Sequence, residues 1–228
     1  MKYLILGDGK LAAELYAQTG WTFISRKKNG IDLRNFNSFV DNTQIIFADV
    51  IINCIGFTET YSRERQTNWD VNYIGVINLV NWCNQHGKKL IQISTDYVYA
   101  NTIKNRNSED DVPVHFCSWY AYTKLLADGY VQAISKNYLL VRTNFKPRPY
   151  PWKRAWDNIH GNFDYVDVIG KLIIQLIEKN AQGVYNVGTE PKTYYELAIQ
   201  TNKEVERSVD HDFLHPINVT MDLTKLHN

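Results

Sequence analysis

The sequence is poor in the features that mark secreted, membrane-spanning or nucleic-acid-binding proteins. Only three of its 228 residues are cysteines (Cys54, Cys83 and Cys117), and they show no paired spacing, which argues against a disulfide framework. The six histidines show no metal-ligand spacing, so no metal site is expected. The formal net charge is +1, whereas nucleic-acid binding usually requires a basic excess.

Long apolar runs are also absent from the chain. No window approaches the roughly 18 apolar residues of a membrane span. The N-terminus MKYLILGDG passes directly into glycines, without the longer apolar region of a signal peptide. We therefore expect a soluble, cytoplasmic protein whose partners include neither nucleic acids nor membranes.

Short apolar runs alternate with stretches of helical periodicity along the whole chain. The pattern predicts strands at 2–6, 22–25, within 45–53, 90–94, 138–141 and 183–187, and helices at 10–18, 68–85, 120–134, 166–178 and 194–201. Since parallel strands need crossover helices between them, this alternation predicts an α/β fold with a Rossmann-type, doubly wound parallel sheet. We expect one domain, in which 1–142 mainly form a cofactor-binding core and 143–228 mainly form a small C-terminal substrate lobe with returning core elements.

A glycine-rich turn follows the first predicted strand. Gly7, Gly9 and Ala12 form the pattern G-x-G-x-x-A directly before the first predicted helix. In dinucleotide-binding turns the first glycine makes the tight turn, the second lets the pyrophosphate approach the backbone, and the small third residue lets helix and strand pack closely. The helix N–H groups then point at the phosphates. The pattern is weak alone, but its place between strand and helix predicts a cofactor site that includes Gly7, Gly9, Lys10 and Leu11.

The end of the second predicted strand indicates which nicotinamide dinucleotide binds. An acidic residue there would bind the ribose 2′-hydroxyl of NAD, whereas an arginine accommodates the 2′-phosphate of NADP. The stretch Ser25-Arg26-Lys27-Lys28 carries cations and no carboxylate, and a phosphate is favoured beside cations. We predict that Ser25, Arg26 and Lys27 bind the cofactor, and that the cofactor is NADPH rather than NADH. A solvated basic turn is the alternative.

Tyr120 and Lys124 stand four residues apart, so their side chains leave the same face of the predicted helix. An ammonium beside a phenol lowers the pKa of the phenol, and such a tyrosine can exchange a proton with a carbonyl oxygen during hydride transfer. Thr95 follows the fourth strand, at the end where ligands bind in open α/β sheets. We predict that these three residues are catalytic and that Tyr120 and Lys124 also contact the cofactor.

Taken in order, these motifs resemble those of the extended short-chain dehydrogenase/reductase family. The resemblance rests on the glycine turn together with Asp32-Leu33, Asn53-Cys54-Ile55-Gly56, Val71-Asn72, the segment STDYV at 94–98, and Tyr120-x-x-x-Lys124. Within the family, STDYVY, YAYTKLLAD, VRTNF, YVDV and PINVTMDLTKL resemble the dTDP-4-dehydrorhamnose reductase group. The resemblance implies an NADPH-dependent reduction of a keto group, at C4, on a nucleotide-activated deoxysugar.

The same resemblance implies positions for further residues. Asp32 and Leu33 would lie by the adenine, Ile55 and Gly56 along the dinucleotide, and Asn72 would support the sheet near the active site. Family members usually have a larger C-terminal part, so a reduced substrate lobe is expected. Helices corresponding to 68–85 often form a dimer in this family, and a homodimer is one interpretation of the apolar helical face there; packing on the sheet is the other.

Candidate substrate contacts come from two segments. Asp96 and Tyr97 directly follow Thr95. The proline-, tryptophan- and cation-rich span 146–156 lies where the resemblance places the diphosphate of a sugar nucleotide. There Arg148 and Arg154 could contact phosphates, and Trp152 could stack on a sugar or base. A proline-stiffened surface loop explains the span equally well.

Two other functions fit the same sequence. One is an epimerase or dehydratase that recycles its cofactor within each turnover. The other is a non-catalytic, dinucleotide-binding regulatory subunit; the short C-terminal part favours it, and the complete set of threonine, tyrosine and lysine argues against it.

Overall fold

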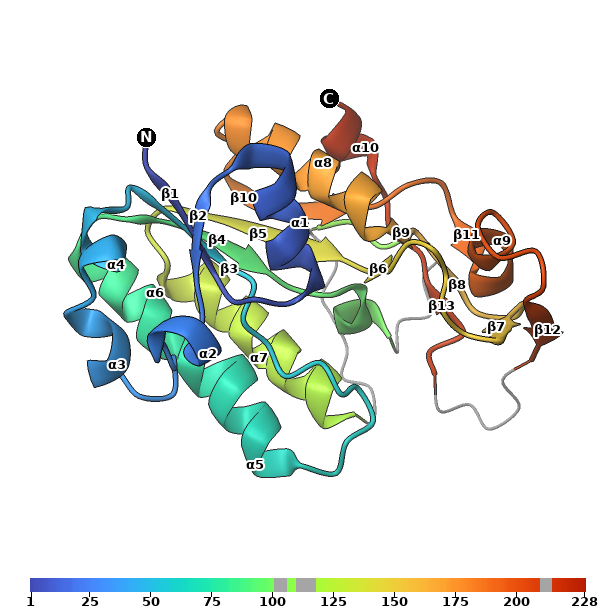
Figure 1. Cartoon of the computed structure of the whole chain (residues 1–228), viewed down its shortest axis with the longest axis horizontal. Coiled ribbons are helices and arrows are strands. Elements are labelled where there is room, and N and C mark those ends of the chain that lie inside the picture. Colours follow the sequence, from blue (N-terminus) through green and yellow to red (C-terminus); the bar gives the residue numbers. More distant parts are fainter. Residues whose placement is uncertain (101–105, 110–117, 210–214) are drawn as a thin grey trace.

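The computed structural model describes residues 1–100, 106–109, 118–209 and 215–228. Its centre is a six-stranded sheet in the order β10-β5-β4-β3-β1-β2 (Figure 1), in which every neighbouring pair is parallel. The strands are β1 (Tyr3–Leu6), β2 (Thr22–Ile24), β3 (Val50–Asn53), β4 (Lys89–Ile93), β5 (Tyr138–Thr143) and β10 (Gly183–Val187). The expected Rossmann-type, doubly wound parallel sheet is confirmed.

The strand order reverses beside β1. From β1 the chain runs outward to β2, and it then returns to β3 on the other side of β1. In open α/β sheets such a reversal opens a crevice outside the carboxyl ends of the strands, and ligands bind in it. The topology therefore points to the ends of β1 and β3 as the place of a site.

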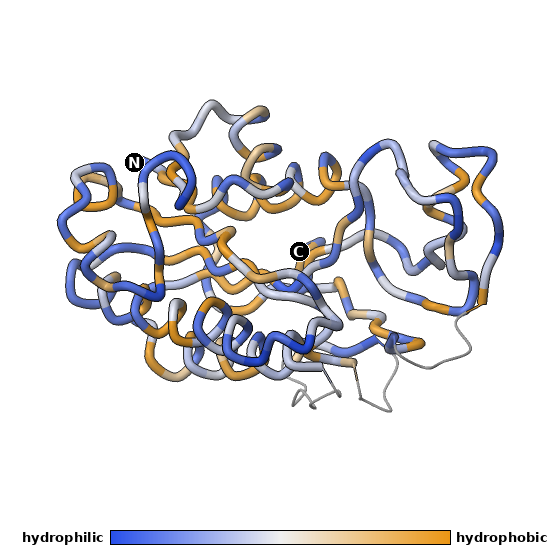
Figure 2. The backbone as a smooth tube through the Cα atoms, turned by 60° about the horizontal axis from the view of Figure 1, so that its bottom comes forward, coloured by the Kyte–Doolittle hydropathy of each residue, from blue (hydrophilic) through white to orange (hydrophobic). Residues whose placement is uncertain are grey.

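Helices cover both faces of the sheet (Figure 1): α1 (Lys10–Thr19) and α8 (Val166–Glu178) on one face, and α6 (Gly75–Gln85) and α7 (Trp119–Ile134) on the other. Successive side chains of a strand point to opposite faces. Leu4 and Leu6 accordingly pack in the core on the α6 side, whereas Ile5 packs with α1 and α8. Figure 2 shows apolar residues concentrated along the central strands and the helices beside them.

The helix expected at 68–85 begins earlier and contains an irregular turn. It starts as α5 (Arg65–Asn68), continues as a π-helical segment (Trp69–Ile74) and ends as α6. The apolar side chains of α6, among them Val76, Leu79 and Trp82, are buried in the core against the sheet. The apolar face of this helix is therefore explained by core packing within one chain.

Short elements connect the main ones. They are α2 (Arg26–Asn29), α3 (Asn37–Val40), α4 (Thr43–Phe47) and a 3-10 turn (Asp96–Tyr99). Because α4 takes the first part of the apolar run 45–53, only its second part forms β3. In the part of the chain that the structure describes, no helix has the length and apolarity needed to cross a membrane.

A smaller lobe lies beyond the carboxyl ends of the sheet, on the right in Figure 1. It has its own core of buried side chains, which includes Phe163, Tyr165, Tyr194 and Leu197. Its elements, with the short strands that lead into it and the last helix of the chain, are β6 (Phe145–Lys146), β7 (Arg154–Trp156), β8 (His160–Gly161), β9 (Asp164–Tyr165), β11 (Lys192–Thr193), α9 (Tyr194–Ala198), β12 (Glu206–Ser208), β13 (Asn218–Val219) and α10 (Thr224–His227).

Candidate active site

A pocket of about 800 Å³ lies at the carboxyl ends of the central strands, between the sheet and the small lobe. Each central strand supplies one wall through the segment that follows it: 7–12 after β1, 54–58 after β3, 93–97 at the end of β4 and 143–147 at the end of β5. The pocket therefore occupies the crevice that the strand reversal creates.

Most residues predicted from the sequence line this pocket. They are Gly7, Gly9, Lys10, Leu11, Ser25, Arg26, Asp32, Leu33, Ile55, Gly56, Thr95, Asp96, Tyr97, Tyr120, Lys124 and Trp152. Lys27, Arg148 and Arg154 do not line it. Lys27 directly follows Arg26 in α2, and neighbouring residues of a helix point about 100° apart, so only Arg26 faces the pocket.

The glycine turn is held tightly against β3. Gly7 has a φ of +115°, and a Cβ atom there would lie 3.3 Å from the carbonyl carbon of Cys54. Its N–H donates a 2.8 Å hydrogen bond to the carbonyl of Ile24, which joins the turn to β2. Gly9 precedes α1 in an extended conformation, and a Cβ there would meet nothing within 4 Å. The first glycine thus serves the turn itself, and the second leaves its side of the backbone open.

Two arginines line the pocket beyond β2: Arg26 at the start of α2, and Arg34 after that helix. Ser25 caps α2 by accepting a 3.3 Å hydrogen bond from the N–H of Lys28, and Arg26 begins the helix. The Asp32 carboxylate already has a cationic partner within the chain, because Nε of Arg34 donates to both of its oxygens at 2.8 and 3.0 Å. This bond lowers the pKa of Asp32. Arg34, which the sequence analysis did not single out, also lines the pocket.

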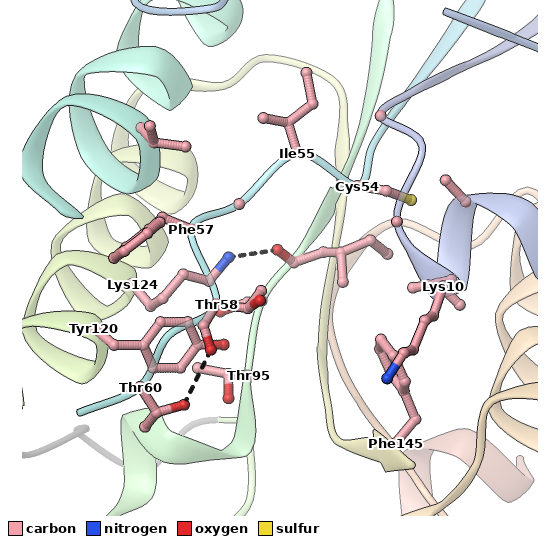
Figure 3. A pocket seen from close by; sticks show the side chains of 18 of the residues that line it. Lys10, Cys54, Ile55, Phe57, Thr58, Thr60, Thr95, Tyr120, Lys124 and Phe145 are labelled. Atoms are coloured by element: carbon pink, nitrogen blue, oxygen red, sulfur yellow. Dashed lines mark hydrogen bonds between the residues drawn. The ribbon is translucent and has the colours of Figure 1, made fainter. Parts of the chain in front are cut away.

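Thr95 and Tyr120 lie together on one side of the pocket (Figure 3), where the Thr95 hydroxyl is near enough to the phenol of Tyr120 to lower its pKa. Thr95 is held in place because its hydroxyl accepts a 3.2 Å bond from the N–H of Tyr97. Lys124 lies one helical turn after Tyr120 and donates a 2.7 Å hydrogen bond to the carbonyl of Ile93. The three predicted catalytic side chains thus converge at the end of β4, with Lys10 and Phe145 across the pocket in Figure 3.

The expected effect of Lys124 on the pKa of Tyr120 needs correction for this structure. Burial raises the pKa of Tyr120 to about 12, and the hydrogen bond with Thr95 opposes this rise only in part. Burial also lowers the pKa of Lys124 to about 8, against the attraction of the Asp128 carboxylate. The Lys124 ammonium is directed to the Ile93 carbonyl, and burial is the largest cause of the shift in the pKa of Tyr120.

Asn72 holds the loop after β3 in place. Its Oδ1 accepts a 2.8 Å bond from the N–H of Phe57, and its Nδ2 donates a 3.0 Å bond to the Phe57 carbonyl. A Cβ at Gly56 would lie 3.5 Å from the same Oδ1. Asn72 lies in the π-helical segment, so the irregular helical turn presents this amide to the wall of the pocket.

The sequence analysis missed several lining residues that lie at or after the end of β5 and in the small lobe, among them Asn144, Lys146 and Tyr194. Asn144 donates from Nδ2 to Asp96 at 3.0 Å and to the Tyr194 hydroxyl at 3.2 Å. Asp96 is fully buried, and burial raises its pKa to about 6. Asn144 and Lys146 follow the last residue of β5, just as Thr95 follows β4. The rule that ligands bind at the carboxyl ends of strands could have identified them.

The predicted phosphate contacts of Arg148 and Arg154 are not supported by their positions. Arg148 pairs with Asp167 at 2.9 Å and lies over the ring of Tyr165. Arg154 pairs with Glu206 at 3.0 Å, and both side chains are exposed. Each guanidinium forms an ion pair with a carboxylate outside the pocket. Trp152 alone of these candidates reaches the pocket.

Known proteins are similar to this chain in sequence. Residues 1–145 match the RmlD substrate binding domain. A dTDP-4-dehydrorhamnose reductase from Mycolicibacterium smegmatis is 29% identical over 140 residues, which are 59% of this chain and 41% of that protein. The spore coat polysaccharide biosynthesis protein SpsK of Bacillus subtilis is 24% identical over 177 residues, which are 75% of this chain and 58% of that protein.

The fold is also found among solved structures. A dTDP-4-dehydrorhamnose reductase from Bacillus anthracis, in complex with NADP, superposes with a TM-score of 0.84 at 22% identity, covering 100% of this chain and 92% of that chain. The aligned parts of the two curated relatives are 41% and 58% of their lengths, so this chain spans less than two thirds of each. The family match extends over residues 1–145 of the 228, which is more than half of the chain and contains the glycine turn and all three convergent side chains. The chain therefore belongs to the RmlD substrate binding domain family.

Proposed function

We propose that this chain is an NADPH-dependent reductase that acts on the C4 keto group of a nucleotide-activated deoxysugar. The observation that carries the proposal is the convergence of Thr95, Tyr120 and Lys124 in one pocket with the glycine turn. A proton donor, a second hydroxyl and a lysine beside a dinucleotide-binding turn are what carbonyl reduction requires. The names of the family relatives, dTDP-4-dehydrorhamnose reductases, support the substrate class.

The residues present fit a dinucleotide. The close approach of Gly7 to Cys54 and the open side of Gly9 form a cradle that a side chain would fill, and the N-terminus of α1 opens onto it. At the far end Arg26 and Arg34 face one carboxylate, Asp32, which Arg34 already binds. An additional phosphate is favoured there over a hydroxyl, which supports NADPH over NADH.

The chain's own residues then account for the chemistry around the carbonyl. When NADPH is bound, its nicotinamide supplies the hydride for the carbonyl carbon. Tyr120, with a pKa of about 12, is protonated at neutral pH and can give its proton to the carbonyl oxygen. The Thr95 hydroxyl, whose proton is donated to Asp96 in the structure, can rotate to donate a hydrogen bond to the same oxygen. Lys124 lies one helical turn after Tyr120, and its hydrogen bond to the Ile93 carbonyl positions the end of β4 against α7. Its positive charge also favours the negative charge that develops on the carbonyl oxygen of the substrate.

The test is an assay of the purified chain with NADPH and a dTDP-4-keto-6-deoxyhexose. We expect one NADPH to be consumed for each molecule of reduced sugar formed, measured by absorbance and product analysis. Conversion without net NADPH consumption would instead indicate an epimerase or dehydratase that recycles its cofactor. NADPH binding without any conversion would favour a non-catalytic, dinucleotide-binding subunit.

Cofactor choice is tested separately by titration with NADPH and with NADH, followed by tryptophan fluorescence. We expect NADPH to bind at least about tenfold more tightly than NADH, a difference of about 1.4 kcal/mol. Equal affinities would contradict the role given to Arg26, and the absence of binding would contradict the cofactor assignment altogether.

A further inference from the structure

At the end of the pocket formed by β5 and β6, an asparagine lies between a buried carboxylate and a lysine. Asn144 donates from Nδ2 to Oδ2 of Asp96 at 3.0 Å, and its Oδ1 lies 3.4 Å from Nζ of Lys146. The Tyr194 hydroxyl accepts a second bond from Asn144, which holds the amide in this orientation. All four residues line the pocket.

The two charged groups differ in how far the described residues satisfy them. The Asp96 carboxylate accepts from Thr95 at 3.2 Å on Oδ1 and from Asn144 at 3.0 Å on Oδ2, and it is fully buried. The Lys146 ammonium carries three donors. Among the described residues, its hydrogen-bond partner is Asn144 at the long distance of 3.4 Å, and no carboxylate lies within 4.0 Å of Nζ.

The Lys146 ammonium is half-buried at the wall of the pocket. Its Nζ lies 4.5 Å from the centre of the Tyr194 ring, and partial removal from water lowers the pKa of this lysine to about 8 although Asp96 favours the charged form. A ligand in the pocket can therefore reach the donors of Lys146 that its protein partners leave open.

We propose that Asn144 and Lys146, with the buried Asp96 holding the Asn144 amide in place, form a subsite that binds the sugar hydroxyl next to the carbon being reduced. A hydroxyl fits because it can accept from the Lys146 ammonium and donate to Oδ1 of Asn144 at the same time. A ligand carboxylate or phosphate can make only the first of these bonds and would be repelled by Asp96. A methylene group would leave the Lys146 ammonium without a strong partner.

The contact between Thr95 and Asp96 indicates which part of the substrate the subsite would bind. Thr95 binds the carbonyl oxygen in the proposed reaction, and it also contacts Asp96 directly. The subsite therefore borders on the reacting carbon. In a 4-keto-6-deoxyhexose one neighbour of that carbon, C5, carries the methyl group, so the hydroxyl in question is the one on C3.

This inference rests on the proposed function and is tested by ligand affinity, separately from turnover. The complex of the chain with NADP⁺ is titrated by calorimetry with a dTDP-6-deoxyhexose and with its 3-deoxy analogue. We expect the unaltered protein to bind the 3-hydroxy sugar at least about tenfold more tightly, or about 1.4 kcal/mol. Lys146→Met should bring the two affinities within about threefold of each other by weakening only the 3-hydroxy ligand.

Two further variants make the result specific. Lys146→Gln keeps an amide donor without the charge, so it should retain an intermediate preference; it also carries the test where Lys146→Met does not fold by circular dichroism. Lys171→Met, which removes an exposed lysine of α8, should leave both affinities unchanged.

The outcomes separate this inference from the proposed function. If the unaltered protein binds neither sugar nucleotide, both the proposed function and the proposed subsite are wrong. If it binds them but shows no preference, or if Lys146→Met and Lys146→Gln keep the full preference or weaken both ligands equally, the subsite is wrong and the function stands.

Discussion

The ammonium of Lys124 donates a 2.7 Å hydrogen bond to the backbone carbonyl of Ile93, the last residue of β4. This bond ties α7 to the strand that carries Thr95. Since Tyr120 lies one turn earlier on α7, this bond also helps to place the tyrosine beside the threonine, whose hydroxyl lowers the pKa of the phenol. The lysine therefore has a positioning role in addition to its charge.

Replacing Tyr120 with phenylalanine should remove the proton donor and leave the cofactor cradle intact. A positioned proton donor contributes about 10²- to 10⁴-fold to rate, so we expect NADPH oxidation to fall by at least about 100-fold. NADPH affinity, measured by fluorescence titration, should stay within about threefold. Tyr130→Phe on the same helix is the matched control, because the Tyr130 hydroxyl bonds Asn81 outside the pocket. An active Tyr120→Phe protein would refute the assignment of Tyr120.

Arg26→Ala should reduce the discrimination between NADPH and NADH. Losing a charge-assisted hydrogen bond costs about 1.5–3 kcal/mol, so NADPH affinity should fall by about 10- to 100-fold while NADH affinity changes little. Titration with both cofactors measures the ratio directly. A parallel loss of affinity for both would show that Arg26 acts on a part of the cofactor that the two share.

The two glycines of the turn should respond differently to alanine. Gly7→Ala places a Cβ against Cys54 at a φ of +115°, so it should lower the free energy of unfolding by about 1 kcal/mol or more and also weaken NADPH binding. Gly9→Ala meets no protein atom within 4 Å, so its unfolding midpoint in urea should be unchanged. Its NADPH affinity should nevertheless fall at least tenfold, because the new Cβ lies where the pyrophosphate approaches. Full affinity in Gly9→Ala would argue against that approach.

Asp96 should make the protein less stable as the pH rises. Its pKa in the folded chain is raised to about 6, so the protonated form is favoured, and the stability present at pH 4 is lost as the carboxyl ionises through pH 6. The shift corresponds to about 3 kcal/mol. Urea unfolding at pH 4 and pH 7.5 should show that Asp96→Asn gains up to this amount relative to the unaltered protein over that interval. A pH-independent difference between the two proteins would contradict the raised pKa.

The buried pair of Arg142 and Asp128 should be sensitive to the loss of one partner. Nε of Arg142 donates to Oδ2 of Asp128 at 2.9 Å, and both side chains are at most 2% exposed. Arg142→Met leaves a buried carboxylate without its cation, so the free energy of unfolding should fall by about 3–5 kcal/mol. The double variant Arg142→Met/Asp128→Leu should recover much of this loss.

The control for that experiment is an exposed arginine–carboxylate pair in the same chain. Arg154→Met breaks the pair with Glu206, whose side chains are 74% and 64% exposed, and should cost no more than about 1 kcal/mol. Equal losses in the two arginine variants would show that burial does not govern the strength of these pairs.

The parts of the fold that depend on local patterns could be predicted from the sequence. The helix Val166–Glu178 and the strand Gly183–Val187 agree with the predicted limits at 166–178 and 183–187, because hydrophobic periodicity reports which face of an element is buried. The glycine turn was predicted from its G-x-G-x-x-A motif, and the pair Tyr120 and Lys124 from its four-residue spacing. Their geometry is set within a few residues of chain.

The sequence by itself determined the succession along the chain of the six central strands and the main helices between them, the cofactor turn and the residues at the end of β4. Only the tertiary structure decided that Asn144 meets Asp96, that Tyr194 closes the same wall, and that Arg148 and Arg154 pair with Asp167 and Glu206 outside the pocket. These contacts join segments far apart in the chain. They depend on how the small lobe packs against the sheet, whereas periodicity and turn motifs describe only neighbours along the sequence.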